Sequence, residues 1–527
     1  MPINGKETRT FKSKDKIHSE DKTVGFNWVK HVGEGFTIKN DARFSSKSAS
    51  SNIPAVVTPF AADGFLFYAI PHLLGKFGTY TFTDKTTGAV LGNVLQAPNI
   101  INGNFAGFKI QAVGPTNFPG ANVQKNSLFF LPMFYSANDR TEFADQFSVS
   151  KKLDNMNFTL GAFYSTVKLD NVGSSQDFGI GVGTMQDKPH LTDIKLQGFD
   201  GKTYQVTDPN GFMDVGRDGA NLSSIKKGQL ALFFGHDWQI NKDLNFDWGI
   251  RYENTSQVGS NTPAIANPRR NDPTYGGLDN NPLTLYDNGG GTQGTALHFN
   301  YSVGTVSFSG GLNYKLSNNQ ALYLRYSNGN KAPDIAYQSY AVDNKQLFAQ
   351  KVVQLEGGYK VSDNKVKLFI TPFYSILSNV PNVQTFTDTT GLTYTPTIQF
   401  AKYTTVGVEI EASYAFTEHW LIRGNAVFQS SKADTYKIWL ANANGKADDK
   451  LQDFSGNKTD NNARTIFNIN PIYNGDKFYA SLNLSYMGAR QANVVNAFEL
   501  PAFSTLDLSL GYDISKKFRL QANINNL

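Results

Sequence analysis

The sequence predicts an all-β protein, a large antiparallel β-barrel that crosses a membrane with its strands. Three observations predict it: long segments alternate apolar and polar residues, tight turns alternate with long connections, and an aromatic residue precedes several turns at one offset. A period of two gives a strand one apolar and one polar face. The composition agrees, because 47 Gly, 40 Phe and 24 Tyr in 527 residues favour turns and strands.

The alternation is clearest near the C-terminus. Apolar residues occupy every second position over 506–514, and the pattern restarts over 518–524 after the turn at 515–517. The same construction spans 230–240 and 244–252. Further tight turns are predicted at 317–319, 362–364, 417–419 and 474–476, and less regular ones near Gly33 and Asp154. The Asn, Asp, Ser and Gly in these turns suit tight reversals. Eight hairpins predict about 16 strands between about residue 24 and residue 527.

The connections between hairpins are long. They are expected at Asn254–Asn300, Asn328–Gln350, Gln429–Asn462 and Gly488–Pro501. Alternating short and long links are typical of a transmembrane barrel of the bacterial outer membrane, with short periplasmic turns and long extracellular loops.

An aromatic residue lies two positions before the last apolar residue ahead of five tight turns. These residues are Trp238, Tyr314, Tyr359, Tyr414 and Tyr512. Each shares the apolar face, so together they predict an interfacial girdle of a membrane barrel. The alternative is ordinary β-propensity, because Tyr and Trp favour strands in any sheet.

Contact with lipid requires the apolar face to point outward. The charged residues of the strands then line the inside of the barrel: Asp247, Arg251, Arg325, Glu356, Glu409, Glu411, Arg423 and Arg519. Such a lining requires a wide, wet lumen or a polar domain that fills it.

Other classes of protein fit poorly. The longest nearly unbroken apolar stretch, Leu128–Tyr135, is too short for a membrane-spanning helix. The net charge of +5 is dispersed, which gives no case for nucleic acid. The N-terminal residues lack the apolar core of a signal peptide. No catalytic arrangement or cofactor motif stands out, and the seven His have no metal-ligand spacing. The chain is therefore not expected to be an enzyme or to carry a cofactor.

Two sets of loop residues are candidate sites. Asp448, Asp449, Asp453 and Asp460 fall in one long loop whose oxygens could gather a calcium ion, although a solvated acidic loop is the simpler reading. Tyr275, Tyr286, Tyr436 and Trp439 are loop aromatics that could stack on an imported ligand such as a sugar or a siderophore.

Several segments resemble the TonB-dependent outer-membrane receptors, most closely the Bacteroidetes type. The resemblance rests on GQLALFFGHDWQINKDLNFDWGIRYE, ALYLRYSNGNKAPDI, QLEGGYK, TTVGVEIEASY and LPAFSTLDLSLGYDISKKFRLQANINNL, which come in the family's usual order over roughly Thr141 to Leu527. The segment Ile3–Pro59 is more weakly similar to the family's middle barrel.

The resemblance implies a barrel of about 22 strands around an N-terminal plug, and energised import of a large ligand: a ferric siderophore, oligosaccharide, vitamin or peptide. It implies four partners: outer-membrane lipid, the TonB-ExbB-ExbD complex acting through the plug, the ligand, and a surface lipoprotein. The plug, the signal peptide, about five first strands and the closing strand are expected to lie outside this chain. The alternative is a plugless channel or an adhesin barrel.

Overall fold

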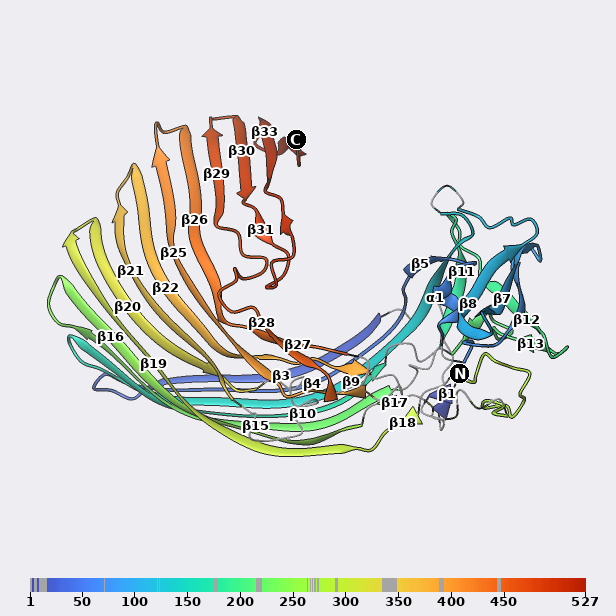
Figure 1. Ribbon diagram of the computed structural model, residues 1–527. Coiled ribbons are helices and arrows are strands. Elements are labelled where there is room, and N and C mark those ends of the chain that lie inside the picture. The colour runs from blue at the N-terminus through green and yellow to red at the C-terminus, as the bar shows by residue number, and fades with distance from the viewer. Residues whose placement is uncertain are drawn as a thin grey trace.

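The computed structural model of the chain consists almost entirely of β-strands (Figure 1). It describes residues 2–3, 7–8, 17–70, 72–120, 122, 124–174, 179–214, 220–262, 264–265, 267, 269, 272, 274–289, 292–333, 348–387, 393–442 and 447–527. The helix α1 (Phe65–Tyr68) is a single turn. Within these ranges, no helix is both long and apolar enough to cross a membrane.

Sixteen long strands form one antiparallel sheet, called the wall below, which curves like the side of a barrel (Figure 1). In chain order they are β3 (Ile17–His31), β4 (Phe36–Pro54), β9 (Ser127–Lys152), β10 (Met156–Ser174), β15 (Ala220–Gln239), β16 (Leu244–Thr262), β19 (Leu297–Ser317), β20 (Gln320–Lys331), β21 (Gln350–Ser362), β22 (Val366–Asn382), β25 (Gln399–Ala415), β26 (Trp420–Thr435), β29 (Thr465–Asn474), β30 (Phe478–Met487), β33 (Phe503–Ser515) and β34 (Phe518–Ile524).

Each wall strand pairs with its neighbours in this order, from the pair β3–β4 to the pair β33–β34. In the described part of the chain no register joins β3 to β34. The run of wall strands therefore has two free edges, which lie apart in Figure 1.

All eight predicted tight turns join consecutive wall strands, so this prediction is confirmed. Side chains of the turns hold them closed. The Oδ1 atom of Asn241 accepts the backbone N–H groups of Asp243 and Leu244, at 2.9 and 3.0 Å. The Oδ1 atom of Asp363 accepts those of Lys365 and Val366, both at 2.8 Å. These are the Asx turns that such sequences favour.

The long connections are shorter than predicted at several ends. β16 continues to Thr262 and β19 begins at Leu297, both inside the expected loop 254–300, and β26 continues to Thr435. The ladder persists there although the apolar alternation has ended, because backbone pairing does not require an apolar face. Of the expected loop 328–350, residues 334–347 lie outside the described residues.

Two connections fold into a separate β-lobe, which the sequence did not predict. Its five-stranded sheet has the order β13 (Thr203–Gln205), β12 (Thr192–Gly198), β6 (Gly78–Asp84), β7 (Val90–Ile101) and β8 (Asn104–Val113). Near the base of the lobe, β9 also pairs with β5 (Val57–Ala61) and with β11 (Ile180–Thr184), which in turn pairs with β14 (Phe212–Met213). The lobe therefore combines the link between β4 and β9 with the link between β10 and β15 (Figure 1).

The main buried core of the described chain lies in this lobe. Phe67, Tyr68, Tyr80 and Phe82 are fully buried there, with ring centroids 5.0–6.2 Å apart and three of the four ring pairs edge to face. The remaining strands are short pairs: β1 (Pro2–Ile3) with β2 (Glu7–Thr8), β17 (Ala264–Ile265) with β18 (Thr292–Gln293), β23 (Phe386–Thr387) with β24 (Thr393–Tyr394), β27 (Lys437–Leu440) with β28 (Lys450–Asp453), and β31 (Arg490–Gln491) with β32 (Glu499–Leu500).

Candidate functional site: the polar inner face of the wall

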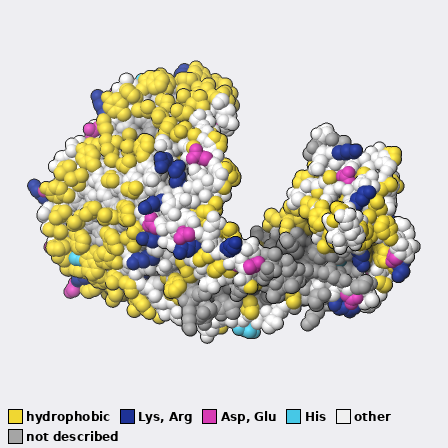
Figure 2. All heavy atoms as spheres, viewed as in Figure 1, with side chains coloured by type: hydrophobic (Ala, Val, Ile, Leu, Met, Phe, Trp, Pro, Cys, Tyr) yellow, Lys and Arg dark blue, Asp and Glu magenta, His cyan; other side chains and the backbone are white. Residues whose placement is uncertain are grey.

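The wall has one apolar face and one polar face. Large hydrophobic side chains are exposed at alternate positions of strand after strand, including Leu160, Leu230, Ile250, Leu324 and Val406, each between 43% and 62% exposed. In water this arrangement would be unfavourable, because each such side chain gains about 1.5–3 kcal/mol on leaving it. Hydrophobic side chains cover much of the wall surface in Figure 2. The apolar face is therefore built to contact lipid, and we call it the apolar belt.

The eight charged residues predicted to line the inside all lie on the opposite face. The registers place Asp247 beside Gly311, and Gly311 beside Arg325. One guanidinium nitrogen of Arg325 donates to both carboxylate oxygens of Asp247, at 2.8 and 2.9 Å. The side chain of Arg251 pairs with Glu253 and lies over the rings of Phe163 and Phe233. The inner face is thus charged and internally paired.

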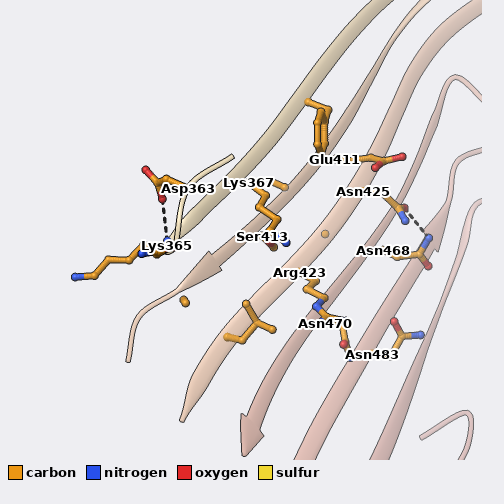
Figure 3. A pocket seen from close by; sticks show the side chains of 16 residues that line it. Asp363, Lys365, Lys367, Glu411, Ser413, Arg423, Asn425, Asn468, Asn470 and Asn483 are labelled. Carbon is orange, nitrogen blue, oxygen red and sulfur yellow. Dashed lines mark hydrogen bonds between the residues drawn. The ribbon is translucent and has the colours of Figure 1, made fainter. Parts of the chain in front are cut away.

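A broad hollow of about 860 Å³ lies on this inner face near the tight turns, between β22 and β30 (Figure 3). Its lining combines charged groups of both signs, Lys367, Glu411 and Arg423, with several amides. The side chain of Asn468 donates to Asn425 at 3.0 Å, and that of Asn470 donates to the carbonyl of Leu482 at 2.7 Å. Amides and mixed charges suit a polar protein surface or a hydrated solute, and nothing here forms a nucleophile with a base.

A smaller hollow of about 250 Å³ lies farther from the turns. Its lining includes two carboxylates, Glu356 and Glu409, with Thr371, Thr405 and Gln429. The hydroxyl of Thr371 lies 2.8 Å from the Tyr323 hydroxyl, which places an aromatic ring on the inner face. Inner-face polarity therefore continues along the strands toward the long connections.

The predicted girdle residues all lie on the apolar face at the tight-turn end. Tyr314, Tyr414 and Tyr512 are 41–48% exposed, and Tyr359 donates its hydroxyl to Gln320 at 2.9 Å. Trp238 lies near His236, whose ring stacks on Phe158 and accepts the indole N–H of Trp248 at 3.0 Å. That these rings mark the membrane interface stays a prediction.

The predicted ligand aromatics do not converge on one site. Tyr436 and Trp439 belong to the link after β26, where the Trp439 backbone N–H donates to Gln384 at 2.6 Å and its indole to the carbonyl of Thr397 at 2.8 Å. Tyr275 accepts a hydrogen bond from Asn267 and lies under the guanidinium of Arg269. Tyr286 packs against the core of the lobe. Their role in ligand binding stays a prediction.

Two of the four aspartates of the calcium hypothesis have other partners. Asp449 accepts the hydroxyl of Tyr394 at 2.8–2.9 Å, and Asp453 pairs with Lys437 at 3.6 Å. Among the described residues, no three or more His, Cys, Asp or Glu side chains form a group that could hold a metal ion. Calcium binding by this loop stays a prediction.

A junction that the sequence did not reveal joins a third connection, between β16 and β19, to the lobe. Leu285 is fully buried in the lobe core, and its backbone N–H donates to the carbonyl of Gln205 at 2.7 Å. The N–H of Gln205 donates in turn to the carbonyl of Leu283 at 2.8 Å. The N–H of Asp214 donates to the carbonyl of Tyr286 at 2.7 Å. Three distant chain segments therefore meet here.

Two carboxylates lie at this junction. Burial, reinforced by the charge of Asp287, raises the pKa of Asp214 to about 7. Burial also raises the pKa of Asp287, against the backbone N–H groups of Asp279 and Leu278 that lower it. The ring of His72 is buried beside the backbone of Asp214 and Gly289. The junction therefore favours a protonated Asp214.

Replacing Asp214 with Asn should stabilise the junction at neutral pH. A carboxyl whose pKa is raised on folding costs nothing below about pH 4, where both states are protonated, and progressively more as the pH rises to about 7. The Asn variant should remove a penalty on the order of 2 to 4 kcal/mol above that pH. Hydrogen exchange of residues 280–288 at matched pH measures it, with Asp187→Asn, an exposed lobe position, as the control. Equal exchange of the Asp214 variant and the unmodified protein at pH 7.5 would contradict the expectation.

An apolar belt outside, a charged face inside and short turns at one end define a transmembrane β-barrel. The family described as TonB dependent receptor-like, beta-barrel matches residues 179–527. The chain therefore belongs to the family of TonB-dependent receptor β-barrels. In barrels of this kind short turns face the periplasm, so we expect the tight turns of this chain on the periplasmic side and the lobe outside the cell.

Solved structures share the fold. The siderophore receptor PiuA from Acinetobacter baumannii is 15% identical with a TM-score of 0.56, and the match covers 97% of this chain and 61% of that one. The ferric-catecholate import receptor Fiu from K12 E. coli is 14% identical with a TM-score of 0.55, covering 97% and 60%. The copper transporter OprC is 12% identical with a TM-score of 0.51, covering 97% and 66%. This chain thus spans about three fifths of the length of the first two. No curated protein matches the chain.

Proposed function

We propose that the protein imports a large polar ligand across the outer membrane, with this chain as the barrel part of a TonB-dependent importer. The observation that carries the proposal is the paired, charged inner face of a wall whose other face is apolar. The solved structures with the same fold include a siderophore receptor and a copper transporter, so iron or copper complexes are the first ligands to test. The energising partner is the TonB-ExbB-ExbD complex, and a surface lipoprotein is a second candidate partner.

Uptake by cells that carry or lack the gene tests this function. Uptake of a labelled ferric siderophore, a copper complex or an oligosaccharide should require both the gene and an intact proton gradient. Uptake that persists without the gradient would support the plugless channel instead. Binding of cells to a surface without any uptake would support the adhesin.

Charge reversal inside the barrel should reduce uptake. Arg423→Glu places a second carboxylate near Glu411, on the adjacent strand in the same hollow. Two like charges held close are unfavourable, so uptake should fall several-fold at unchanged receptor level. Lys516→Glu reverses a charge at an exposed tight turn and should leave uptake unchanged. Equal uptake by both variants would count against a role for the hollow.

A further inference from the structure

A carboxylate lies within the apolar belt. On β9 the positions of the apolar face read Thr141, Phe143, Asp145 and Phe147, since alternate residues share a face. Phe143 and Phe147 are 38% and 43% exposed and belong to the belt. Elsewhere on the described wall strands, each Asp, Glu, Lys or Arg of the apolar face lies at an end of the belt. Asp145 differs from them, because it faces lipid between apolar neighbours.

The carboxylate has one amide partner on the same face. The register places Asn40 of β4 beside Phe147, and the Nδ2 atom of Asn40 donates to the Oδ1 atom of Asp145 at 2.6 Å. The same nitrogen lies 3.5 Å from the carbonyl oxygen of Gln146, which is long for a hydrogen bond. In the described part of the chain no donor contacts the Oδ2 atom of Asp145. One carboxylate oxygen and one amide N–H thus lack a good partner.

Aromatic side chains surround this polar pair, where β3, β4, β9 and β10 lie side by side (Figure 1). Trp28 of β3 lies directly opposite the amide, and Tyr164 of β10 lies directly opposite the carboxylate. Phe44 and Phe143 face each other at the next position of the apolar face toward the long connections. The four rings are between 38% and 50% exposed. We call the pair and these rings the belt patch: Trp28, Asn40, Phe44, Phe143, Asp145 and Tyr164.

Lipid does not satisfy the polar pair. A carboxylate in hydrocarbon is unfavourable unless another group pairs with it. A lysine or arginine could extend to the head groups, but the short side chain of Asp145 cannot reach past Phe143, which lies about 7 Å farther along the strand. An apolar surface gains little by exchanging lipid for another apolar surface, so the rings alone would not select a partner. The pair therefore supplies the specific attraction.

We propose that the belt patch binds the belt patch of a second copy of this chain in the membrane. Two copies inserted in the same direction can be related by a two-fold axis along the membrane normal, which sets their polar pairs at the same depth. The remaining N–H of Asn40 in each copy then donates to the Oδ2 atom of Asp145 in the other. Both copies are satisfied without a further donor, so a second copy fits the patch better than an unrelated protein does.

Cross-linking in cell membranes tests this contact. The chain has no Cys, so each variant adds a single thiol to it. Ala42→Cys places the thiol in the patch, because Ala42 lies directly opposite Asp145 in the register. A short bis-maleimide should then give a product of twice the mass of the receptor. Val406→Cys places the thiol on the distant strand β25, at a belt position that is 53% exposed, and should give no such product.

The dissociation constant of the dimer is the second readout. It is measured by sedimentation equilibrium on the purified full-length receptor in detergent. Asp145→Leu should raise it about tenfold, because the substitution removes two symmetry-related hydrogen bonds between the copies. Asn254→Leu is the control and should leave it unchanged, since Asn254 lies on the apolar face of β16 with the uncharged Ser302 as its partner. Unchanged heat-modifiable gel mobility shows that both variants are folded.

Three outcomes would overturn the proposal. The first is no cross-linked product from Ala42→Cys, which would leave the patch to lipid. The second is a product of a different mass, which would assign the patch to another membrane protein. The third is an equal dissociation constant for the two leucine variants. A product of twice the mass together with a weaker dimer of Asp145→Leu supports the proposal, whether or not the protein transports a siderophore.

Discussion

A Gly358→Val variant should fail to assemble a stable wall. Gly358 lies on β21 with the ring of Tyr323 from β20 directly over it, and a Cβ atom there would be 2.3 Å from Tyr323 Cε1 and 2.8 Å from the carbonyl oxygen of Ile370. The ring cannot easily move, because its hydroxyl bonds to Thr371 and the ammonium of Lys360 lies 4.2 Å from its centroid. Overpacking of this kind costs about 1–3 kcal/mol or more.

Urea unfolding and heat-modifiable gel mobility measure the effect. The matched control is Gly235→Val, because Gly235 also lies on the inner face of the wall but has no atom within 4 Å of an added Cβ. It should behave like the unmodified protein to within about 1 kcal/mol, since valine favours strands. Equal behaviour of the two variants would contradict the clash. Adding Tyr323→Ala to Gly358→Val should restore much of the loss.

The packing of an aromatic ring over a glycine of the neighbouring strand recurs along the wall. The ring of Phe233 covers Gly161, and that of Phe373 covers Gly407, where added Cβ atoms would lie 2.2 and 2.7 Å from ring carbons. Glycine leaves room on the inner face for a ring from the neighbouring strand, which is how sheets pack a large side chain on a curved surface. We therefore expect these glycines to tolerate substitution poorly.

The wall was predictable because its determinants are local. Alternation with a period of two assigns each residue to a face, and Asn241 and Asp363 close their own turns through backbone N–H groups within three residues. Neither feature depends on which strands become neighbours. Both the turns and the inner-face charges could therefore be located before any pairing was known.

The lobe was not predictable on the same grounds. β6 and β12 also alternate buried and exposed residues, so their pattern is that of a wall strand. At seven residues each they are shorter than the 9–11 residues that cross a bilayer, which is the one signal the sequence offers. The longest apolar stretch, Leu128–Tyr135, falls where β9 leaves the wall to pair with β5 and β11 at the base of the lobe.

The positions of the candidate ligand aromatics were not predictable either. They depend on how the long connections pack, which the alternation of apolar and polar residues does not describe.

A Leu285→Ala variant should release the connection between β16 and β19 from the lobe. Leu285 is fully buried, and removing a buried leucine side chain costs about 2–5 kcal/mol. The backbone bonds to Gln205 and the N–H bond from Asp214 hold this segment to the lobe. The burial of Asp214 and Asp287 opposes these bonds, because desolvation disfavours the charged form of each carboxylate. Little free energy therefore holds the segment to the lobe once the Leu285 side chain is removed.

Limited proteolysis of residues 274–289 on intact cells measures this release. Leu283→Ala is the matched control, because Leu283 is 39% exposed and bonds to Gln205 only through its backbone, which the substitution keeps. Cleavage should become many-fold faster in the Leu285 variant and change little in the control; equal rates would show that the backbone bonds alone hold the junction. Because this connection also carries Tyr275, release should weaken ligand binding only if that ring contacts the ligand. Binding measured beside proteolysis therefore separates the anchoring of the connection from a role in recognition.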